Sequence, residues 1–461
     1  MKLIDIIDSC KGSSTNVDLE EKISEITIDS REAKAGDLFV ALVGERVDGH
    51  DFIESAYKNG CRIFLVNKNR DINFMKDDMY LIKVDDTEIA LGDISKRYKD
   101  NFKIPFIGVT GSVGKTTTRD MIYSVVSTKF RTLRNEKNYN NQIGVPLTLF
   151  NLEENHECAI VEMGMCGFNE IEYLANIVNP RIGVISNIGQ SHIEKLGSQE
   201  GIFKAKMEIA TNFDEESTLV VNGDDSFLKS LKNEKQIYKL ITFGYDSDND
   251  LYCKKYNLGE AESTFICDID GKEEEFYIPT AGKHNIYNAL AAICVGRALG
   301  MDIDSIREGL KMFAPTGMRQ RIESYENITV INDVYNASPD SMKAALEVLG
   351  AYKNRRVAIL GDIYEMGDFV ESGMKEISKS VLRNVDVLIT VGENSKYIGV
   401  GVKELGDEDI KIYHYKEKEL IELDKLISEG DVVLVKASRG MQLEYTVEAL
   451  KMLNERLKQN V

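Results

Sequence analysis

The sequence predicts an α/β protein of three domains. Its 461 residues are too many for one hydrophobic core. Short apolar runs alternate with helical stretches, which is the pattern of parallel sheets covered by helices. The strongest motif, TGSVGKTT, joins a predicted strand to a predicted helix through glycines. We expect domains at residues 1–102, 103–313 and 314–461, the last of them Rossmann-like and doubly wound.

The first predicted domain is small and rich in β-structure. Residues 1–102 contain the runs EITIDSR, DLFVAL, CRIFLV and YLIKV, with helical stretches between them. The polar segment SKRYKDNFK then leads into the strand before the glycine motif. This pattern predicts an N-terminal α/β domain.

The other two predicted domains alternate strands with helices. Residues 103–313 include the strand-like runs ECAIVEMG, RIGVISNIG and STLVVNGDD, and the closely spaced runs in 236–279 predict a small antiparallel excursion. Pro315 and Gly317 mark the following boundary. Five further runs predict the third sheet, with ligands at the carboxyl ends of its strands: ITVINDV, RRVAILGD, VDVLITVG, IKIYHY and DVVLVKAS.

Composition narrows the class of protein. The net charge of -19 argues against a nucleic-acid-binding surface. No apolar run approaches the ~20 residues of a membrane span, and Asp5 and Asp8 interrupt the first apolar stretch, so we expect no secretory signal. The seven cysteines form no C-x-x-C pair, which is typical of free thiols in a reducing compartment. We therefore expect a soluble cytoplasmic protein.

The glycine motif predicts a triphosphate site. Its glycines let backbone N–H groups approach phosphates, Lys115 reaches the β- and γ-oxygens, and the Thr116 hydroxyl would bind Mg²⁺. Val109 stands where the strict G-x-x-x-x-G-K-[ST] pattern has glycine. A GTPase would need N-K-x-D after the loop, whereas NKNR precedes it and lacks the Asp. The predicted ATP-binding residues of the loop are Gly111, Ser112, Val113, Gly114, Lys115, Thr116 and Thr117.

Three residues further along are candidates by position. Glu162 ends a predicted strand after the loop, where such enzymes place an acid that holds Mg²⁺. His192 follows another strand, and Lys206 lies on a predicted helix. Taken singly, a histidine of this kind is more often structural and a helix lysine more often solvated, so position leaves both readings open.

Several segments, in this order and spacing, resemble the Mur ligases, which are ATP-dependent amino-acid or peptide ligases of peptidoglycan synthesis. They span essentially the whole chain: TGSVGKTTTRDM, NYNNQIGVPLTL, SNIGQSHIEKLGSQEGIFKAKMEI, AGKHNIYNALAA and VKASRG. VEMGM, NDVYNASPDSM and LGDIYEMG resemble the branch that adds D-alanyl-D-alanine to UDP-N-acetylmuramoyl-tripeptide. The N-terminal DSREAKAGDLFVALVGERVDGHDFIESAYKNG is similar to the UDP-sugar-binding domain of the family.

The resemblance implies an activity and leaves alternatives. It implies that ATP converts the tripeptide carboxylate into an acyl phosphate, which the dipeptide amine then opens. One alternative is the ligase that adds diaminopimelate or lysine, whose DYAHTPD-like stretch and D-N-P-R motif are missing here. The other is a folylpolyglutamate synthase-like ligase, which lacks the YNASP segment. No motif indicates whether the tripeptide ends in lysine or diaminopimelate.

The resemblance also implies catalytic roles. Lys115 and the loop amides would hold the ATP phosphates, Thr116 and Glu162 would hold Mg²⁺, and His192 would bind a second metal ion. Lys206 matches the lysine that the family converts with CO₂ into a carbamate, which serves as a further anionic metal ligand. The implied catalytic residues are Lys115, Glu162, His192 and Lys206.

Binding residues follow from the same resemblance. Those implied for the nucleotide are Asn285, Asn288, Arg319, Asp333, Tyr335 and Asn336. Those implied for the UDP-sugar are Ser30 and Arg31 at the uridine, and Asn138, Asn140 and Asn141 at the sugar. Lys436 and Ser438 are implied either to contact the incoming dipeptide or only to support the end of the sheet. The implied partners are small molecules, and we expect a monomer. Met374 stands where the family usually carries a histidine, seven residues past the glycine of LGDIYEMG.

Overall fold

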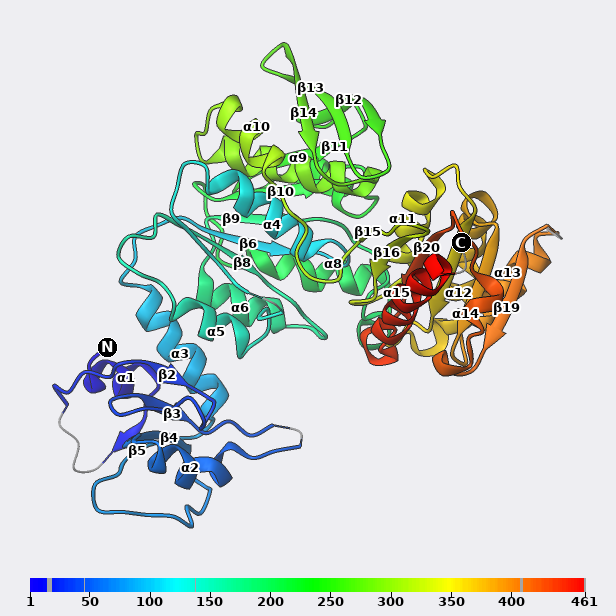
Figure 1. Cartoon of the computed structure of the whole chain (residues 1–461). Coiled ribbons are helices and arrows are strands. Elements are labelled where there is room, and N and C mark those ends of the chain that lie inside the picture. Colours follow the sequence, from blue (N-terminus) through cyan, green and yellow to red (C-terminus); the bar gives the residue numbers. More distant parts are fainter. Residues whose placement is uncertain (15–18, 45, 137, 407–408, 460–461) are drawn as a thin grey trace.

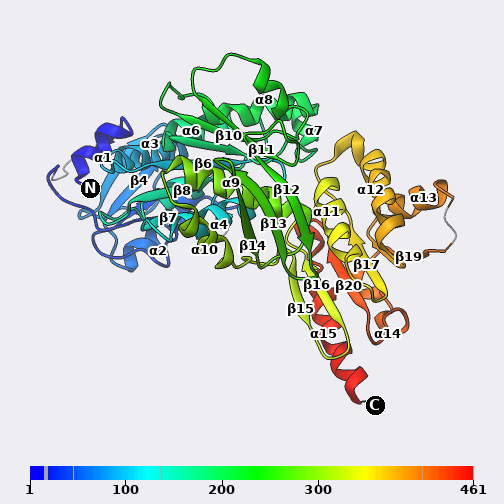
Figure 2. The same cartoon turned by 90° about the horizontal axis from the view of Figure 1, so that it is seen from above.

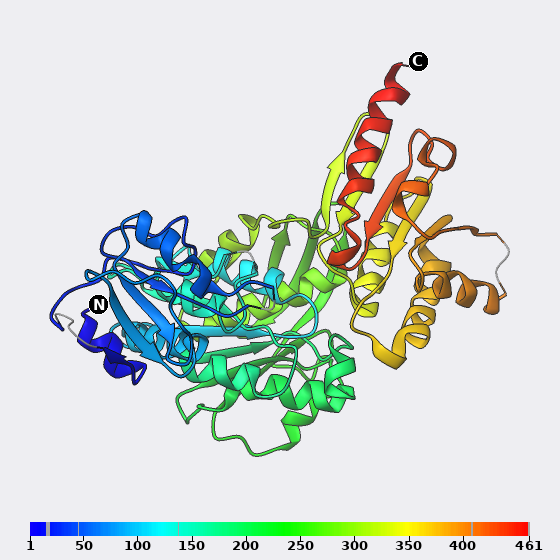
Figure 3. The same ribbon diagram turned by 90° about the horizontal axis from the view of Figure 1, so that it is seen from below.

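The computed structural model describes residues 1–14, 19–44, 46–136, 138–406 and 409–459. These residues form three β-sheets of five, nine and six strands with helices packed on their faces (Figure 1). The nine-stranded sheet lies between the other two, which occupy opposite ends of the molecule (Figures 2 and 3). The α/β class with three domains, expected from the alternating pattern, is confirmed.

The N-terminal sheet has the order β1-β5-β4-β3-β2 and is parallel except for β1. Its strands are β1 (Ser13–Ser14), β2 (Ile26–Thr27), β3 (Leu38–Val40), β4 (Ile63–Asn67) and β5 (Tyr80–Val84). Its helices are α1 (Leu3–Ser9), α2 (Ile53–Lys58) and α3 (Thr87–Lys99). Side chains alternate along β3, so Leu38 packs with α1 and α3 on one face while Phe39 packs with α2 on the other.

The central sheet has the order β14-β13-β12-β11-β10-β9-β6-β8-β7. Its strands are β6 (Phe106–Thr110), β7 (Thr132–Arg134), β8 (Cys158–Glu162), β9 (Ile182–Ile185), β10 (Thr218–Asn222), β11 (Lys239–Gly244), β12 (Leu251–Leu258), β13 (Ser263–Ile269) and β14 (Lys272–Ile278). The strands β12, β13 and β14 are antiparallel, as expected for 236–279. The segment is not a separate excursion, however, because β11 pairs in parallel with both β10 and β12 and extends the main sheet.

Two layers of helices cover the central sheet. One face carries α4 (Lys115–Val126), α9 (Lys283–Ala298) and α10 (Ile303–Lys311). The other face carries α5 (Gly144–Leu149), α6 (Glu170–Val178), α7 (Ile193–Leu196) and α8 (Gln199–Met207). The strands between them are buried on both sides, which explains their continuous apolar runs.

The C-terminal sheet has the order β15-β16-β20-β17-β18-β19, with β15 antiparallel to its neighbour. Its strands are β15 (Arg321–Ser324), β16 (Thr329–Asp333), β17 (Arg356–Gly361), β18 (Val387–Val391), β19 (Lys411–Tyr415) and β20 (Val432–Lys436). One face carries α11 (Pro339–Gly350), α12 (Val370–Asn384) and α13 (Lys396–Glu404), and the other carries α14 (Leu423–Leu426) and α15 (Glu444–Gln459). The domain is therefore doubly wound, as expected.

Met374, the departure from the family pattern, lies within this fold. It is fully buried on α12, among the apolar side chains between that helix and the sheet. In this chain the position therefore contributes to the core of the C-terminal domain.

Candidate active site

The glycine loop lies between β6 and α4 and has the backbone that its glycines predict. Gly111 has φ 153° and Gly114 has φ 82°, conformations that side-chain-bearing residues rarely adopt. A Cβ on Gly111 would lie 1.9 Å from Ser186 Oγ, so only glycine fits there. Lys115 is the first residue of α4, which aims the helix N-terminus and its N–H groups at the loop.

Lys115 folds back over the loop. Its Nζ donates to the carbonyl oxygen of Gly111 at 2.9 Å and lies 3.5 Å from that of Ser112. Loss of water around the ammonium lowers the pKa of Lys115, while Glu162 raises it and Arg319 lowers it further. The cation thus sits where a phosphate would replace the carbonyl groups as its partner.

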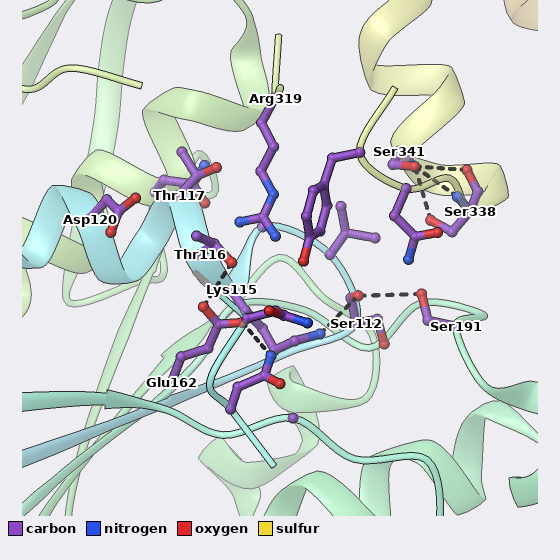
Figure 4. Close-up of a pocket in the computed structure, with 18 of the residues that line it drawn as sticks. Ser112, Lys115, Thr116, Thr117, Asp120, Glu162, Ser191, Arg319, Ser338 and Ser341 are labelled. Carbon is purple, nitrogen blue, oxygen red and sulfur yellow. Dashed lines mark hydrogen bonds between the residues drawn. The ribbon is translucent and has the colours of Figure 1, made fainter. Parts of the chain in front are cut away.

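Glu162, at the end of β8, is buried and bonded through both oxygens. Thr116 Oγ1 donates to Oε2 at 2.7 Å (Figure 4). Asn140 Nδ2 donates to Oε1 at 2.8 Å. Asn135 also exchanges hydrogen bonds with the backbone of Glu162. A hydroxyl and a carboxylate held together beside a phosphate loop are the hard oxygen ligands that Mg²⁺ prefers, so the pair fits the ion.

No ready-made metal cage accompanies this pair. The described part of the chain has no group of three or more His, Cys, Asp or Glu side chains arranged for an ion. Magnesium typically takes one or two protein ligands and completes its shell with phosphate oxygens and water. The arrangement suits an ion that arrives with a nucleotide.

Sequence reasoning missed a buried charged network beside Glu162. Arg119 Nη1 lies 3.2 Å from Glu162 Oε2, and Arg119 Nη2 lies 2.7 Å from Asp120 Oδ1. Arg134 Nη1 reaches the same Asp120 oxygen at 2.9 Å, and Thr316 Oγ1 donates to Asp120 Oδ2. The only sign of this network in the sequence is the adjacent Arg119 and Asp120 in TTTRDM. Neighbouring charged residues on a helix are ordinarily solvated, so the pair did not indicate burial.

His192 meets a residue of the C-terminal domain. Its Nδ1 lies 2.6 Å from Glu365 Oε2, in the loop after β17. A hydrogen bond with Cys166 and the contact with Glu365 raise the pKa of His192 despite burial. Both His192 and Glu365 have left-handed backbone, with φ 64° and 61°. This contact between two domains had no signal in the sequence.

Lys206 lies in the last turn of α8, with its side chain buried at 1% exposure. In the described residues no carboxylate forms an ion pair with it. Burial, and then the charge of Lys115, lower the pKa of its ammonium well below the usual value. It does not line the cavities described below, although it is close enough to Lys115 for their charges to interact.

The predicted nucleotide residues come from two domains. Asn285 and Asn288 on α9 are buried and bonded to each other, and Thr118 Oγ1 donates to Asn288 Oδ1 at 2.9 Å. From the C-terminal domain, the Arg319 guanidinium lies 4.0 Å from the centre of the Tyr335 ring. His284, which was not predicted, lines the same space, with Nε2 2.8 Å from Gln320 Oε1.

Asp333 and Lys436 form a buried pair at the ends of adjacent strands. Lys436 Nζ lies 2.6 Å from Asp333 Oδ2 and donates to the Asn336 carbonyl at 2.9 Å. The charge of Lys436 is therefore neutralised by Asp333, and its ammonium also bonds to a backbone carbonyl. Ser438 Oγ accepts a hydrogen bond from the Tyr364 N–H, in the loop after β17.

Two cavities open between the central and C-terminal domains. The first has a volume of about 590 Å³ and the second about 410 Å³. Lys115, Ser112 and His192 line both. Most of the predicted residues line the first: Ser112, Val113, Gly114, Lys115, Thr116, Thr117, Asn138, Asn140, Asn141, Glu162, His192, Asn285, Asn288, Arg319, Asp333, Tyr335, Asn336 and Lys436. Ser438 lines the second.

The remaining predicted residues lie elsewhere. Gly111 shapes the loop without lining a cavity. Ser30 and Arg31 lie in the N-terminal domain, away from both cavities. Ser30 is buried and its carbonyl accepts from Asn59 Nδ2 at 2.8 Å, whereas Arg31 is exposed and pairs with Asp29 at 2.5 Å. The residues predicted to bind uridine therefore lie in a different domain from the residues predicted to bind phosphate.

This fold and site define a class: a P-loop nucleotide enzyme whose catalytic cavity is completed by a doubly wound domain. Comparison with known families agrees. The Mur ligase middle domain matches residues 109–296, the Mur ligase glutamate ligase domain matches 319–439, and the Mur ligase family catalytic domain matches 22–99. The chain belongs to the Mur ligase family.

Individual relatives cover nearly its whole length. A Bacillus subtilis protein named UDP-N-acetylmuramoyl-tripeptide–D-alanyl-D-alanine ligase is 37% identical, over 96% of this chain and 97% of its own. A crystal structure of MurF from Acinetobacter baumannii has a TM-score of 0.90 and 28% identity, covering 97% of this chain and 98% of that one. MurF ligase from Thermotoga maritima in complex with ADP has a TM-score of 0.83 and 26% identity, covering 96% and 100%.

Proposed function

We propose that this chain joins D-alanyl-D-alanine to UDP-N-acetylmuramoyl-tripeptide at the expense of ATP, forming the UDP-muramoyl-pentapeptide. The observation that carries the proposal is the position of Lys115. It lies where two cavities meet between the central and C-terminal domains, so a phosphate held there is within reach of ligands in both. Relatives named for this reaction match 96% and 98% of the chain.

ATP occupies the first cavity in this proposal. The N–H groups of the glycine loop and Lys115 hold its phosphates, and the base lies toward Asn285 and Asn288. Arg319, Asp333, Tyr335 and Asn336 close the cavity from the C-terminal domain. Thr116 and Glu162 would hold Mg²⁺, whose charge would offset that of the phosphate oxygens.

The chemistry follows from these positions. A carboxylate of the tripeptide attacks the γ-phosphate in line, with Lys115 stabilising the charge that spreads over its oxygens. ADP leaves, and the product is an acyl phosphate. The dipeptide amine then attacks the acyl carbon, and phosphate leaves as the amide forms. Acyl phosphates hydrolyse in water, so the C-terminal domain that lines the cavities also serves to exclude it.

Lys206 fits the carbamate that the family resemblance implies. Only a neutral amine reacts with CO₂. Burial and the charge of Lys115 lower the pKa of Lys206, which favours the neutral amine. The described residues offer it no carboxylate partner, so its burial as an ammonium would be costly. We propose that a carbamate on Lys206 places a negative charge beside Lys115 and toward the metal that His192 would help to hold.

The UDP-sugar spans the distance to the N-terminal domain in this scheme. Ser30 and Arg31 contact the uridine end, while Asn138, Asn140 and Asn141 contact the sugar beside the first cavity. None of the helices in the described part of the chain has the length and hydropathy needed to cross a bilayer. We place the reaction in the cytoplasm, where ATP is available, and expect the enzyme to act as a monomer.

The test is phosphate release from ATP and Mg²⁺ with each substrate omitted in turn. We expect release only with UDP-N-acetylmuramoyl-tripeptide and D-alanyl-D-alanine together, and a pentapeptide product by mass spectrometry. Parallel assays with lysine- and diaminopimelate-containing tripeptides identify the acceptor. Phosphate release with a UDP-muramoyl-dipeptide plus lysine or diaminopimelate would contradict the proposal in favour of the ligase that adds those amino acids. Phosphate release with folate plus glutamate would contradict it in favour of a folylpolyglutamate synthase-like ligase.

A further inference from the structure

The second cavity, of about 410 Å³, lies where the C-terminal fold is expected to bind ligands. The strands β17 and β20 are parallel neighbours. The helix that follows β17, α12, packs on one face of the sheet, whereas α15, which follows β20, packs on the other. In doubly wound sheets, ligands bind in the crevice that such a divergence opens at the carboxyl ends of the strands. Tyr364 and Arg439, in the loops that follow these two strands, both line the cavity.

The two loops are fixed to each other. The Ser438 N–H donates to the Asp362 carbonyl at 3.0 Å, and Ser438 Oγ accepts from the Tyr364 N–H at 2.9 Å. A Cβ on Gly440 would lie 2.7 Å from the Tyr364 ring, so the backbone passes close to that ring. Arg439 therefore projects from a braced turn and not from a loose loop.

Three basic side chains occur among the described residues that line this cavity: Lys115, His192 and Arg439. Lys115 is assigned to the phosphates, and His192 lies against Glu365. Lys436, which lines only the first cavity, is neutralised by Asp333. Arg439 pairs with a carboxylate as well, Glu444, but through Nη1 alone, so it keeps donors for an anionic group in the second cavity.

Arg439 also has donors free for such a group. Its Nη1 pairs with Glu444 at the start of α15, which anchors one edge of the guanidinium. No bond to Nε or Nη2 is found among the described residues, and the side chain is 57% exposed. The free edge carries the parallel N–H donors that bind a carboxylate through both oxygens.

The incoming dipeptide supplies that carboxylate. Its amine must reach the acyl phosphate formed beside Lys115, which lines the cavity from the central domain. Its carboxylate then lies about 7 Å away along an extended dipeptide, and Arg439 lines the same cavity from the C-terminal domain. We propose, on the basis of the function proposed above, that Arg439 binds the terminal carboxylate of D-alanyl-D-alanine and makes the enzyme selective for dipeptides with a free C-terminus.

The test compares D-alanyl-D-alanine with its C-terminal amide, which has the same shape without the charge. Initial rates are measured for the wild type and for Arg439→Gln and Arg439→Lys. We expect the wild type to prefer the acid by about 10- to 100-fold in kcat/KM, the scale of a charged hydrogen bond. Arg439→Gln loses this factor on the acid, mainly through KM, and treats acid and amide alike. Arg439→Lys retains part of the preference.

Arg383→Gln is the matched control, because Arg383 is exposed in the last turn of α12 and lines neither cavity. KM for ATP and for the tripeptide substrate should stay at the wild-type value in all variants. An Arg439→Gln enzyme that keeps the wild-type acid-to-amide ratio would overturn the assignment, as would a wild type that does not distinguish the two dipeptides. A wild type that makes no pentapeptide overturns the proposed function itself, which separates the two failures.

Discussion

Lys206 is the residue whose environment is least expected of its type. A lysine at 1% exposure, without a carboxylate partner in the described part of the chain, is destabilising as an ammonium. We predict that Lys206→Ala loses most of the ligase activity and that added short carboxylic acids, such as formate or acetate, restore part of it. The measurement is phosphate release at saturating substrates, over a concentration series of the acid.

Lys204 is the control on the same helix. It is exposed and pairs with Glu200 one turn away, so Lys204→Ala should retain wild-type activity and show no response to the acids. A Lys206→Ala enzyme as active as the wild type would rule out a carbamate role.

The lowered pKa of Lys206 also predicts a pH dependence of stability. The folded state holds the amine neutral while the unfolded state protonates it below its usual pKa of 10.5, so unfolding takes up a proton. The free energy of unfolding of the wild type in CO₂-free buffer should therefore rise with pH, from the folded-state pKa up to 10.5. Lys206→Met lacks this contribution, so the amount by which it is more stable than the wild type should shrink as pH rises. Thermal melts of both proteins at about pH 7 and about pH 9 measure the difference, and a constant gap would contradict a neutral buried amine.

The carboxylate of Asp120 pairs with two guanidinium groups beside Glu162, the proposed Mg²⁺ ligand. Arg119 and Arg134 both bond to its Oδ1, and its side chain is 2% exposed. We predict that Asp120→Asn lowers the stability of the central domain by about 3–5 kcal/mol, because it removes the buried carboxylate that pairs with Arg134 and that shares Arg119 with Glu162. Glu153→Gln, which breaks an exposed pair with Arg131, should change it by at most about 1 kcal/mol. Denaturant melts followed by circular dichroism compare the two, and equal effects would contradict the buried network.

At the scale of elements, the contact between α3 and α6 joins the N-terminal domain to the central one. Gly92 faces α6, where a Cβ would lie 2.1 Å from the Tyr173 hydroxyl and 3.0 Å from Ile177. Tyr98, also on α3, donates from its hydroxyl to the Leu152 carbonyl at 2.8 Å. The helices approach closely because glycine supplies no side chain at their crossing.

We predict that Gly92→Ala destabilises this contact, although alanine is the better helix former by about 1 kcal/mol. The melting temperature should fall, and adding Tyr173→Phe, which removes the obstructing oxygen, should recover part of the loss. Lys96→Ala, on the exposed side of α3, should leave the melting temperature nearly unchanged. A rise in melting temperature for Gly92→Ala would mean that helix propensity outweighs packing here.

The elements also show where sequence patterns reach their limit. The glycine loop and the buried strands β6, β8 and β9 were expected from local pattern, because their backbone requirements are written in adjacent residues. The pairing of β11 with β12 was not, because strand partners are chosen by packing between segments distant along the chain. The domain boundaries remain a prediction.

At the scale of the molecule, the nucleotide cavity exists only because two domains meet. Arg319 points toward the glycine loop from the C-terminal domain (Figure 4), and Tyr335 lines the same cavity. Thr316, in the segment that connects the domains, bonds to Asp120. We predict that Mg²⁺ and ADP protect both residues 111–117 and residues 333–338 from hydrogen exchange. The strands β3 and β4 of the N-terminal sheet, which line neither cavity, should show no change.

Hydrogen exchange with mass spectrometry measures this protection peptide by peptide. Protection limited to residues 111–117 would mean that the C-terminal domain does not take part in nucleotide binding. The roles proposed for Arg319, Tyr335 and Asn336 would then fail, while those of the loop would stand.

The sequence by itself determined the α/β class, the phosphate loop and the family, because each depends on residue types at short, regular spacing. It also indicated Glu162, His192 and Lys206, though their roles depended on resemblance. Only the tertiary structure decided that Arg119 and Asp120 are buried, that Glu365 reaches His192, and that Arg439 borders a second cavity. Burial and contacts across domains depend on how distant segments pack, and no local pattern of residues encodes that packing.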